Sequence, residues 1–183
     1  RGEALGVMGR NGSGKSTLLK IVSGIYRPDA GAVHCHGSLT PILELGVGWN
    51  PELAAVDNIC LIGTVMGMTL RELRKAVPEI LAFAGLEEFA GLQLKHYSTG
   101  MAARLAYAIA FLAVGDVLIL DEILSVGDAA FRGLCDERFR TLRKAGHSAV
   151  LVSHQGQDIA DFCDRAILLE KGRVIREGSG REI

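Results

Sequence analysis

Residues 9–17 read Gly9-Arg10-Asn11-Gly12-Ser13-Gly14-Lys15-Ser16-Thr17, which is the pattern G-x-x-x-x-G-K-[ST]. An apolar run, residues 4–8, precedes this stretch, and a run typical of a helix, residues 17–22, follows it. A glycine-rich turn between a strand and a helix lets backbone N–H groups converge on a phosphate, and the helix N-terminus favours the same negative charge. The stretch therefore predicts a phosphate-binding loop.

Two side chains of this loop carry further chemistry. Lys15 brings a positive charge to the β- and γ-phosphates of a nucleotide, and the Ser16 hydroxyl is a ligand for Mg²⁺. An ordinary glycine-rich turn that caps a helix is the alternative interpretation. The strand before the loop and the helix after it argue against that alternative.

The composition limits the classes of protein to consider. The 183 residues are 49% hydrophobic and 22% charged, which allows one domain with a sizeable core. A formal net charge of −1 argues against a nucleic-acid partner. The four cysteines form no C-x-x-C pair, so a zinc site or a disulfide framework is not expected. Because no apolar run reaches the roughly 20 residues of a membrane span, we expect membrane contact only through a partner.

The order of apolar runs predicts the fold class. Four short runs are typical of buried strands: residues 3–8, 117–120, 149–152 and 166–169. Helical stretches separate them, which favours an α/β fold with a mostly parallel sheet flanked by helices. Lys171-Gly172 predicts a hairpin turn near the end. Residues from about 56 to 115 carry no strand signal, so we expect an inserted helical subdomain there. Because residue 1 directly precedes the first strand, we also expect N-terminal strands to be missing.

Two acidic residues end the second apolar run. Asp121 and Glu122 follow Val117-Leu118-Ile119-Leu120. In a protein with a phosphate-binding loop, the first acid at such a strand end holds Mg²⁺, and the second can polarise an attacking water as a general base. We expect the acids and the loop to meet at the carboxyl ends of neighbouring strands. A solvated acidic turn is the alternative.

Two further positions are candidates with plainer alternatives. Ser98 and Gly100 precede the small and apolar residues 102–112, so they are typical of a capped helix. If another subunit supplies the first site, this helix N-terminus is a second place for a γ-phosphate. His154 ends the run 148–153, which we expect beside the phosphate loop. A surface histidine or a buried, hydrogen-bonded one is the alternative to a γ-phosphate contact.

Taken together, these motifs resemble the ABC-type nucleotide-binding domain, a P-loop NTPase, over nearly the whole chain, residues 1–183. The resemblance implies ATP and Mg²⁺ as cofactors and a head-to-tail homodimer with ATP between the two copies. It implies that Glu122 is the catalytic base and that His154 senses the γ-phosphate. It also implies that Ser98 and Gly100 bind the γ-phosphate across the dimer, and that Asp128 bridges the two sites.

A narrower resemblance covers three segments and the signature. Residues 42–53 read I-L-E-L-G-V-G-W-N-P-E-L, residues 57–63 read D-N-I-C-L-I-G, and residues 123–128 read I-L-S-V-G-D. Tyr97-Ser98-Thr99-Gly100-Met101 replaces the commoner L-S-G-G-Q. These segments are similar to those of the ATPases that export O-antigen, capsular polysaccharide or teichoic acid. The resemblance implies a transmembrane permease partner and a peripheral place on the cytoplasmic face of the bacterial inner membrane.

The chain also departs from the common pattern of the family. No glutamine lies near Glu44, so Glu44 or Leu45 occupies the Q-loop position, and Glu44 becomes a candidate Mg²⁺ ligand. Met101 removes a side-chain amide from the signature. The aromatic residue that stacks on adenine in the family normally lies upstream of Arg1. Two alternatives stay open: a non-transport ABC ATPase that acts on ribosomes or DNA, and a poorly hydrolysing regulatory ABC domain.

Overall fold

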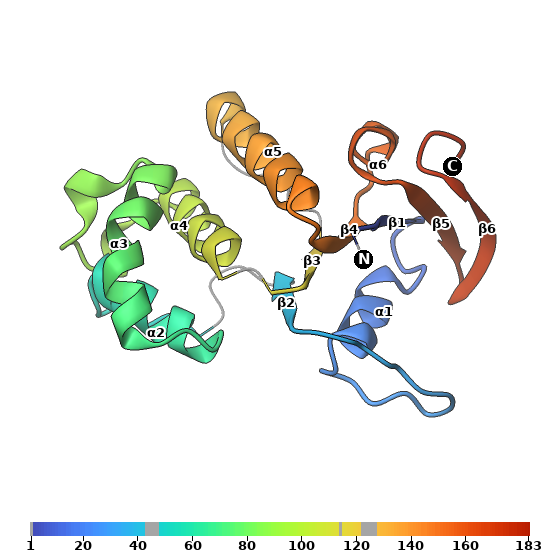
Figure 1. Ribbon diagram of the computed structural model, residues 1–183, viewed down its shortest axis with the longest axis horizontal. Helices are drawn as coiled ribbons and strands as arrows, with labels where there is room; N and C mark the ends of the chain where they lie inside the picture. The colour runs from blue at the N-terminus through green and yellow to red at the C-terminus, as the bar shows by residue number, and fades with distance from the viewer. Residues whose placement is uncertain (1, 43–47, 114, 122–127) are drawn as a thin grey trace. The chain divides into compact units, whose positions relative to one another are not determined.

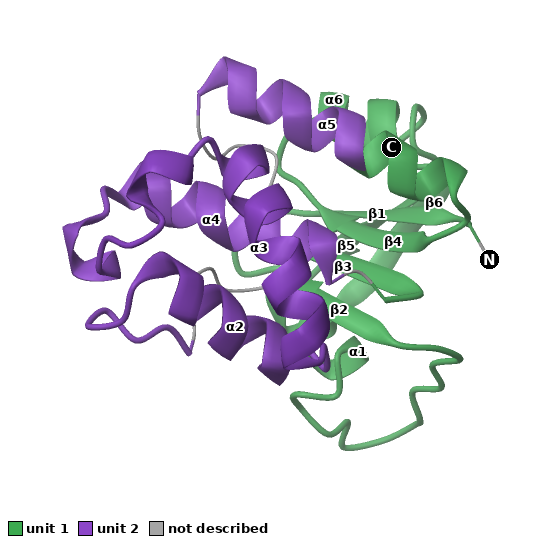
Figure 2. Ribbon diagram, turned by 60° about the vertical axis from the view of Figure 1, so that its left-hand side comes forward, with its two compact units in different colours: residues 1–43, 115–124, 139–183 green, residues 44–114, 125–138 purple. Residues whose placement is uncertain are grey.

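The computed structural model describes residues 2–42, 48–113, 115–121 and 128–183. They form two compact units, coloured in Figure 2. Unit 1 consists of Arg1–Leu43, Gly115–Leu124 and Phe139–Ile183, and unit 2 consists of Glu44–Val114 and Ser125–Arg138. Glu44, Leu45 and Glu122 lie outside the described residues.

Unit 1 contains a sheet that has six strands among the described residues, in the order β2-β3-β4-β1-β5-β6 (Figure 1). The strands are β1 (Ala4–Met8), β2 (Leu39–Ile42), β3 (Val117–Asp121), β4 (Ser148–Val152), β5 (Arg165–Glu170) and β6 (Arg173–Ser179). The pairs from β2 to β5 are parallel, and β6 runs antiparallel to β5. The predicted α/β class, its four apolar strands and the final hairpin are confirmed.

Two details of the sheet differ from the expectation. β2 was not predicted, because Pro41 interrupts its short sequence. Proline has no backbone N–H and is tolerated at a sheet edge, and among the described strands β2 pairs with β3 alone. The strands that precede the phosphate loop and Asp121 are also not neighbours, because β4 lies between β1 and β3.

The core of unit 1 lies where the sheet meets helix α1 (Lys15–Val22). Val7, Ile119 and Val152 come from three different strands and pack with Leu19 of α1, all with 0% exposure. On β1, a side chain at Gly6 would come within 2.7 Å of Ile159 on helix α6 (Gly156–Phe162). Close packing against these helices thus fixes β1, the strand that leads into the phosphate loop.

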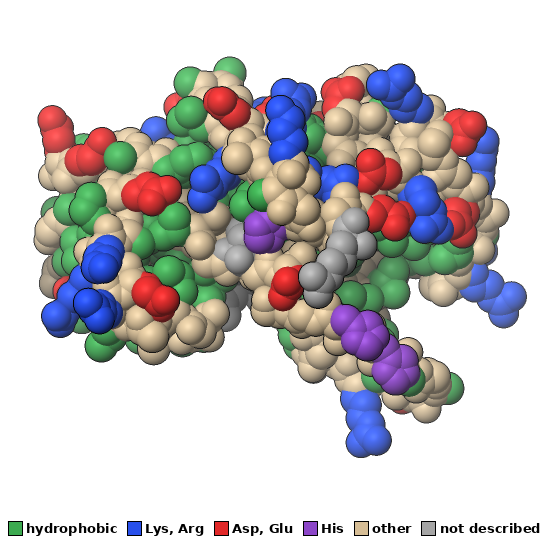
Figure 3. Space-filling view, viewed as in Figure 1, with side chains coloured by type: hydrophobic (Ala, Val, Ile, Leu, Met, Phe, Trp, Pro, Cys, Tyr) green, Lys and Arg blue, Asp and Glu red, His purple; other side chains and the backbone are tan. Residues whose placement is uncertain are grey.

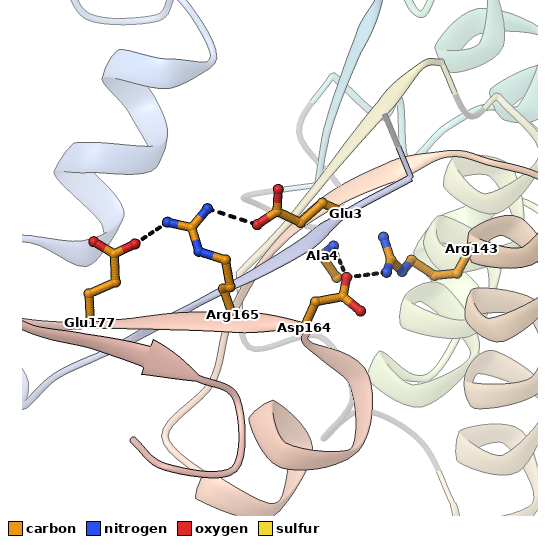
Figure 4. Close-up of polar contacts among 6 residues, drawn as sticks. All are labelled: Glu3, Ala4, Arg143, Asp164, Arg165 and Glu177. Atoms are coloured by element: carbon orange, nitrogen blue, oxygen red, sulfur yellow. Dashed lines mark hydrogen bonds and ion pairs between the residues drawn. The ribbon is translucent and has the colours of Figure 1, made fainter.

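Polar contacts gather around the N-terminal end of β1, the end away from the phosphate loop (Figure 4). Asp164 accepts the Ala4 N–H at 2.7 Å and pairs with Arg143. Arg165 pairs with Glu177 and, at 3.0 Å, with Glu3. The hydrogen bonds to these two carboxylates, first that to Glu177, raise the pKa of Arg165. On the face seen in Figure 3, acidic and basic side chains lie interspersed over unit 1.

Unit 2 is helical. Its helices are α2 (Ala55–Val65), α3 (Leu70–Ala84), α4 (Thr99–Leu112) and two short 3-10 turns, Glu87–Phe89 and Leu94–His96. Ile59, Ile80, Leu105 and Ile109 form the centre of its buried cluster. The first part of helix α5 (Ala129–Lys144), as far as Arg138, also belongs to this unit. In the described ranges, no helix is both long and apolar enough to cross a membrane.

The first turn of α3 illustrates how side chains close a helix N-terminus. Thr69 Oγ1 accepts the Glu72 N–H at 3.3 Å, and the Glu72 carboxylate accepts the Thr69 N–H at 2.8 Å. This capping box satisfies two backbone donors at once. Its hydrogen bonds, first that from the Thr69 hydroxyl, lower the pKa of Glu72.

Candidate nucleotide site

The phosphate loop forms the turn between β1 and α1. The structure explains why two of its positions require glycine. Gly9 has φ of 153°, and a Cβ there would lie 2.3 Å from the Leu169 carbonyl oxygen. Gly14 precedes α1 with φ of 105°, a conformation that other residues rarely adopt. The loop therefore follows a path that side chains at these two positions would prevent.

Lys15 lies inside the loop. Its side chain is nearly buried, with the residue 6% exposed. The ammonium group donates to the Gly9 carbonyl at 2.8 Å and to the Arg10 carbonyl at 3.1 Å. Because these contacts hold the charge against the loop backbone, it stands where converging loop N–H groups would bind phosphate oxygens.

The hairpin between β5 and β6 braces the loop from outside. The Gly172 N–H donates to the Ser13 carbonyl at 2.8 Å. Lys171 and Gly172 both have positive φ, 47° and 76°, as a tight hairpin turn requires. The sequence predicted the turn but gave no sign of its contact with Ser13, because the two segments are far apart in the chain.

Ser16 and Asp121 come together although their strands are not neighbours. The Ser16 hydroxyl donates to Asp121 Oδ2 at 3.0 Å. A hydroxyl and a carboxylate oxygen are ligands that Mg²⁺ accepts, with water and phosphate oxygens usually completing its octahedron. Among the described residues, no cluster of three or more His, Cys, Asp or Glu side chains is arranged to hold a metal. The pair therefore offers two oxygen ligands to a Mg²⁺ ion.

A pocket of about 310 Å³ opens over the loop. Its lining is formed by Asn11, Gly12, Gly14, Lys15, Ser16, Thr17 and His154. His154 reaches the pocket because β4 pairs directly with β1, as expected from the sequence. The structure thus places His154 beside the loop residues that were predicted to bind phosphate.

The remaining candidates belong to unit 2 and have local structural roles there. Ser98 precedes α4, and its hydroxyl oxygen accepts the Met101 N–H at 3.1 Å. Gly100 is exposed in the first turn of this helix. Asp128 accepts the Phe131 N–H at 2.9 Å and so caps the start of α5. The phosphate loop, Asp121 and His154 all belong to unit 1.

Known proteins resemble this chain over most or all of its length. The family model described as ABC transporter matches residues 1–125. The O-antigen export system ATP-binding protein RfbB of Klebsiella pneumoniae is 38% identical over 183 residues, which are 100% of this chain and 74% of that protein. The teichoic acids export ATP-binding protein TagH of Lactiplantibacillus plantarum is 39% identical over 99% of this chain and 50% of its own length.

Other curated relatives are also longer, since the chain spans 59% and 42% of the length of two of them. Among solved structures, the dimeric ATP-binding cassette MJ0796 in a post-hydrolysis state, bound to ADP and Pi, superposes with a TM-score of 0.83. It is 27% identical, and the match covers 98% of this chain and 86% of that one. The phosphate loop, the fold and these matches together show that the chain belongs to the ABC transporter family.

Proposed function

We propose that this chain is an ATP-binding and ATP-hydrolysing subunit of a bacterial exporter that moves a lipid-linked polysaccharide. The observation that carries the proposal is that Lys15, Ser16 and His154 line one pocket of unit 1, while the Ser16 hydroxyl also donates to Asp121. The substrate class is supported by RfbB and TagH, which are named for O-antigen and teichoic acid export. Because the chain spans only part of the length of these relatives, its substrate and partners belong to the proposal.

Each residue of the site has a role in this proposal. Lys15 and the N–H groups of residues 9–17 hold the β- and γ-phosphates and stabilise charge that develops during transfer. Ser16 and Asp121 would hold Mg²⁺, with Glu44 as a further candidate ligand, and the ion would neutralise phosphate charge. Glu122 orients the attacking water as general base, and His154 contacts the γ-phosphate from the end of β4.

The assembly is also proposed. Two copies pair head to tail, so that Ser98 and Gly100 of one copy meet the γ-phosphate bound by the other, and Asp128 bridges the two sites. The dimeric state of the similar cassette bound to ADP and Pi supports such pairing. A transmembrane permease provides the membrane contact at the cytoplasmic face of the inner membrane. In this proposal, residues 1–183 form one ABC ATPase domain, with a helical subdomain at about residues 56–115.

One experiment tests both hydrolysis and pairing. Glu122→Gln removes the proposed base, so we expect ATP turnover to fall about 10²–10⁴-fold while ATP stays bound. Size in solution is then measured with and without Mg-ATP, and we expect a shift from monomer to dimer with it. Glu79→Gln, an exposed acid on α3, is the matched control. Normal turnover in the Glu122 variant would remove this residue from the role of base.

Size, hydrolysis and dependence on a partner together separate the proposed functions. A variant that binds ATP and stays monomeric would contradict pairing by the chain alone. A wild-type chain that binds Mg-ATP without hydrolysing it, in the presence of its permease as well, would favour the regulatory alternative. Activity that depends on ribosomes or DNA and not on a permease would favour the non-transport alternative.

A further inference from the structure

A buried carboxylate lies close in sequence to the histidine of the pocket. Asp158, in the first turn of α6, is only 7% exposed, and Ser153, the residue before His154, is 5% exposed. Carboxylates are almost never so deeply buried unless they are paired or hydrogen-bonded. The proposed mechanism gives neither side chain a task, so their burial calls for a separate explanation.

Three hydrogen bonds close a small ring around the turn that carries His154. The Ser153 hydroxyl donates to Asp158 Oδ2 at 2.9 Å. The same hydroxyl oxygen accepts the Gln155 N–H at 3.0 Å. The Asp158 N–H donates to the Gln155 carbonyl at 3.2 Å. The residues on both sides of His154 are therefore tied to each other and to α6.

The direction of these bonds assigns the controlling role to the carboxylate. A serine hydroxyl has one hydrogen to donate and two lone pairs to accept. When its hydrogen points to Asp158, a lone pair remains for the Gln155 N–H. Without the carboxylate, the Ser153 side chain loses the partner that holds its rotamer, so its hold on the Gln155 N–H weakens.

We propose that Asp158 is a positioning residue that, through Ser153, fixes the turn presenting His154 to the phosphate pocket. This inference rests on the proposed function, because it gives His154 a task at the γ-phosphate. Asp158 itself does not line the pocket. The plainer interpretation is that an acid in the first turn only stabilises the N-terminus of α6. The two interpretations differ in whether the effect of Asp158 passes through His154.

The test is a double-mutant cycle on ATP hydrolysis by the full chain. Asp158→Ala is expected to lower kcat about tenfold, the effect of losing one charge-assisted hydrogen bond, and to leave the KM for ATP within about twofold. In a His154→Ala background, adding Asp158→Ala should change kcat by less than about twofold, because the two residues act through one path. Equal fractional losses in both backgrounds would overturn the proposal.

Conservative and control variants complete the test. Ser153→Ala should reproduce the loss, whereas Ser153→Thr and Asp158→Asn keep a hydroxyl and an acceptor oxygen and should restore most of kcat. Asp161→Ala, an exposed acid on the same helix, should leave kcat unchanged. If Asp158→Ala fails to fold, the Ser153 pair decides: equal kcat in Ser153→Ala and Ser153→Thr would overturn the proposal.

A spectroscopic readout separates this inference from the proposed function. The imidazole resonances of His154, assigned by their loss in His154→Ala, are expected to shift or broaden in Asp158→Ala and not in Asp161→Ala. Unchanged resonances would overturn the positioning role even if hydrolysis fell. If the wild-type chain hydrolysed no ATP, the proposed function would fail, and a shift of these resonances would still support the link from Asp158 to His154.

Discussion

Helices α1 and α4 begin in different ways, although each starts beside a glycine and is a candidate for binding phosphate. At α1, the residue before the helix is Gly14, and no side chain caps the first turn. At α4, the hydroxyl of Ser98 already accepts the Met101 N–H. The first turn of α1 thus leaves its N–H groups to an anion, whereas α4 satisfies one of its own.

The surroundings of the two helix starts differ in the same sense. Lys15 brings a cation into the α1 loop, and Ser16 joins it to Asp121 within the same unit. The first turn of α4 contains no charged residue, since it reads Thr99-Gly100-Met101-Ala102. We infer that the α1 site binds nucleotide within one chain and that the α4 start acts only on a phosphate already held elsewhere.

The largest expected effect is that of Lys15→Ala. Removing the loop cation takes away charge-assisted hydrogen bonds to the phosphates, so the Kd for ATP should rise by about 10–100-fold or more. Titration calorimetry with Mg-ATP measures it. Lys20→Ala, on the same helix but outside the pocket lining, should bind ATP normally. Unchanged affinity in the Lys15 variant would mean that the α1 loop is not the nucleotide site.

Gly9→Ala should have the next largest effect. The new Cβ would stand 2.3 Å from the Leu169 carbonyl oxygen, so the loop must shift. Forcing extra atoms into a packed site typically costs about 1–3 kcal/mol, which should lower the free energy of unfolding and weaken ATP binding together. Denaturant unfolding and calorimetry measure the two. Gly133→Ala, on α5 with open space around it, should instead be neutral or stabilising; equal losses in both variants would contradict this account.

Ser98→Ala tests the other half of the comparison. Loss of the α4 cap should reduce the free energy of unfolding by about 0.5–2 kcal/mol. ATP affinity of the single chain should stay unchanged, because Ser98 is not among the residues that line the pocket, while ATP turnover should fall. Thr69→Ala at α3 is the control for loss of a cap alone. A Ser98 variant that binds ATP as weakly as the Lys15 variant would erase the distinction between the two helix starts.

The smallest expected effect is a pH dependence of the stability of the first turn of α3, where the capping residue Glu72 can be protonated. Because the pKa of Glu72 is lowered on folding, its contribution to stability is fully present above the unfolded value of 4.5 and is lost as pH falls through the folded pKa. The protection of the amides of residues 70–73 against hydrogen exchange, taken relative to the intrinsic rate at each pH, should therefore fall in acid. Glu72→Gln should abolish that pH dependence, and its persistence would assign the effect to another group.

The sequence predicts those parts of the site that depend on local pattern. A glycine-rich turn, a lysine at its end and an apolar strand ending in Asp121 are all readable from neighbouring residues. β2 escaped prediction because Pro41 is unfavourable in most strands and is acceptable here only at an edge. The expected adjacency of β1 and β3 was wrong because strand order is set by crossover connections, which no single strand encodes.

Contacts between distant segments could not be predicted from spacing. Gly172 contacts Ser13, and the carbonyl oxygen of Leu169 excludes a side chain at Gly9. The burial of Asp158 could not be predicted either, because an acid in the first turn of a short helix is commonly exposed. Its importance follows only from the fold, which buries it behind Ser153.

The Gly172–Ser13 contact has a consequence for the order of events during synthesis. β1 emerges from the ribosome before its partners β4 and β5 and the hairpin turn at Gly172, which follow up to roughly 160 residues later. At about 5–20 residues per second, the strand and loop wait roughly 8–30 s for these partners. A nascent chain therefore completes the packing around its phosphate loop only near the end of this stretch.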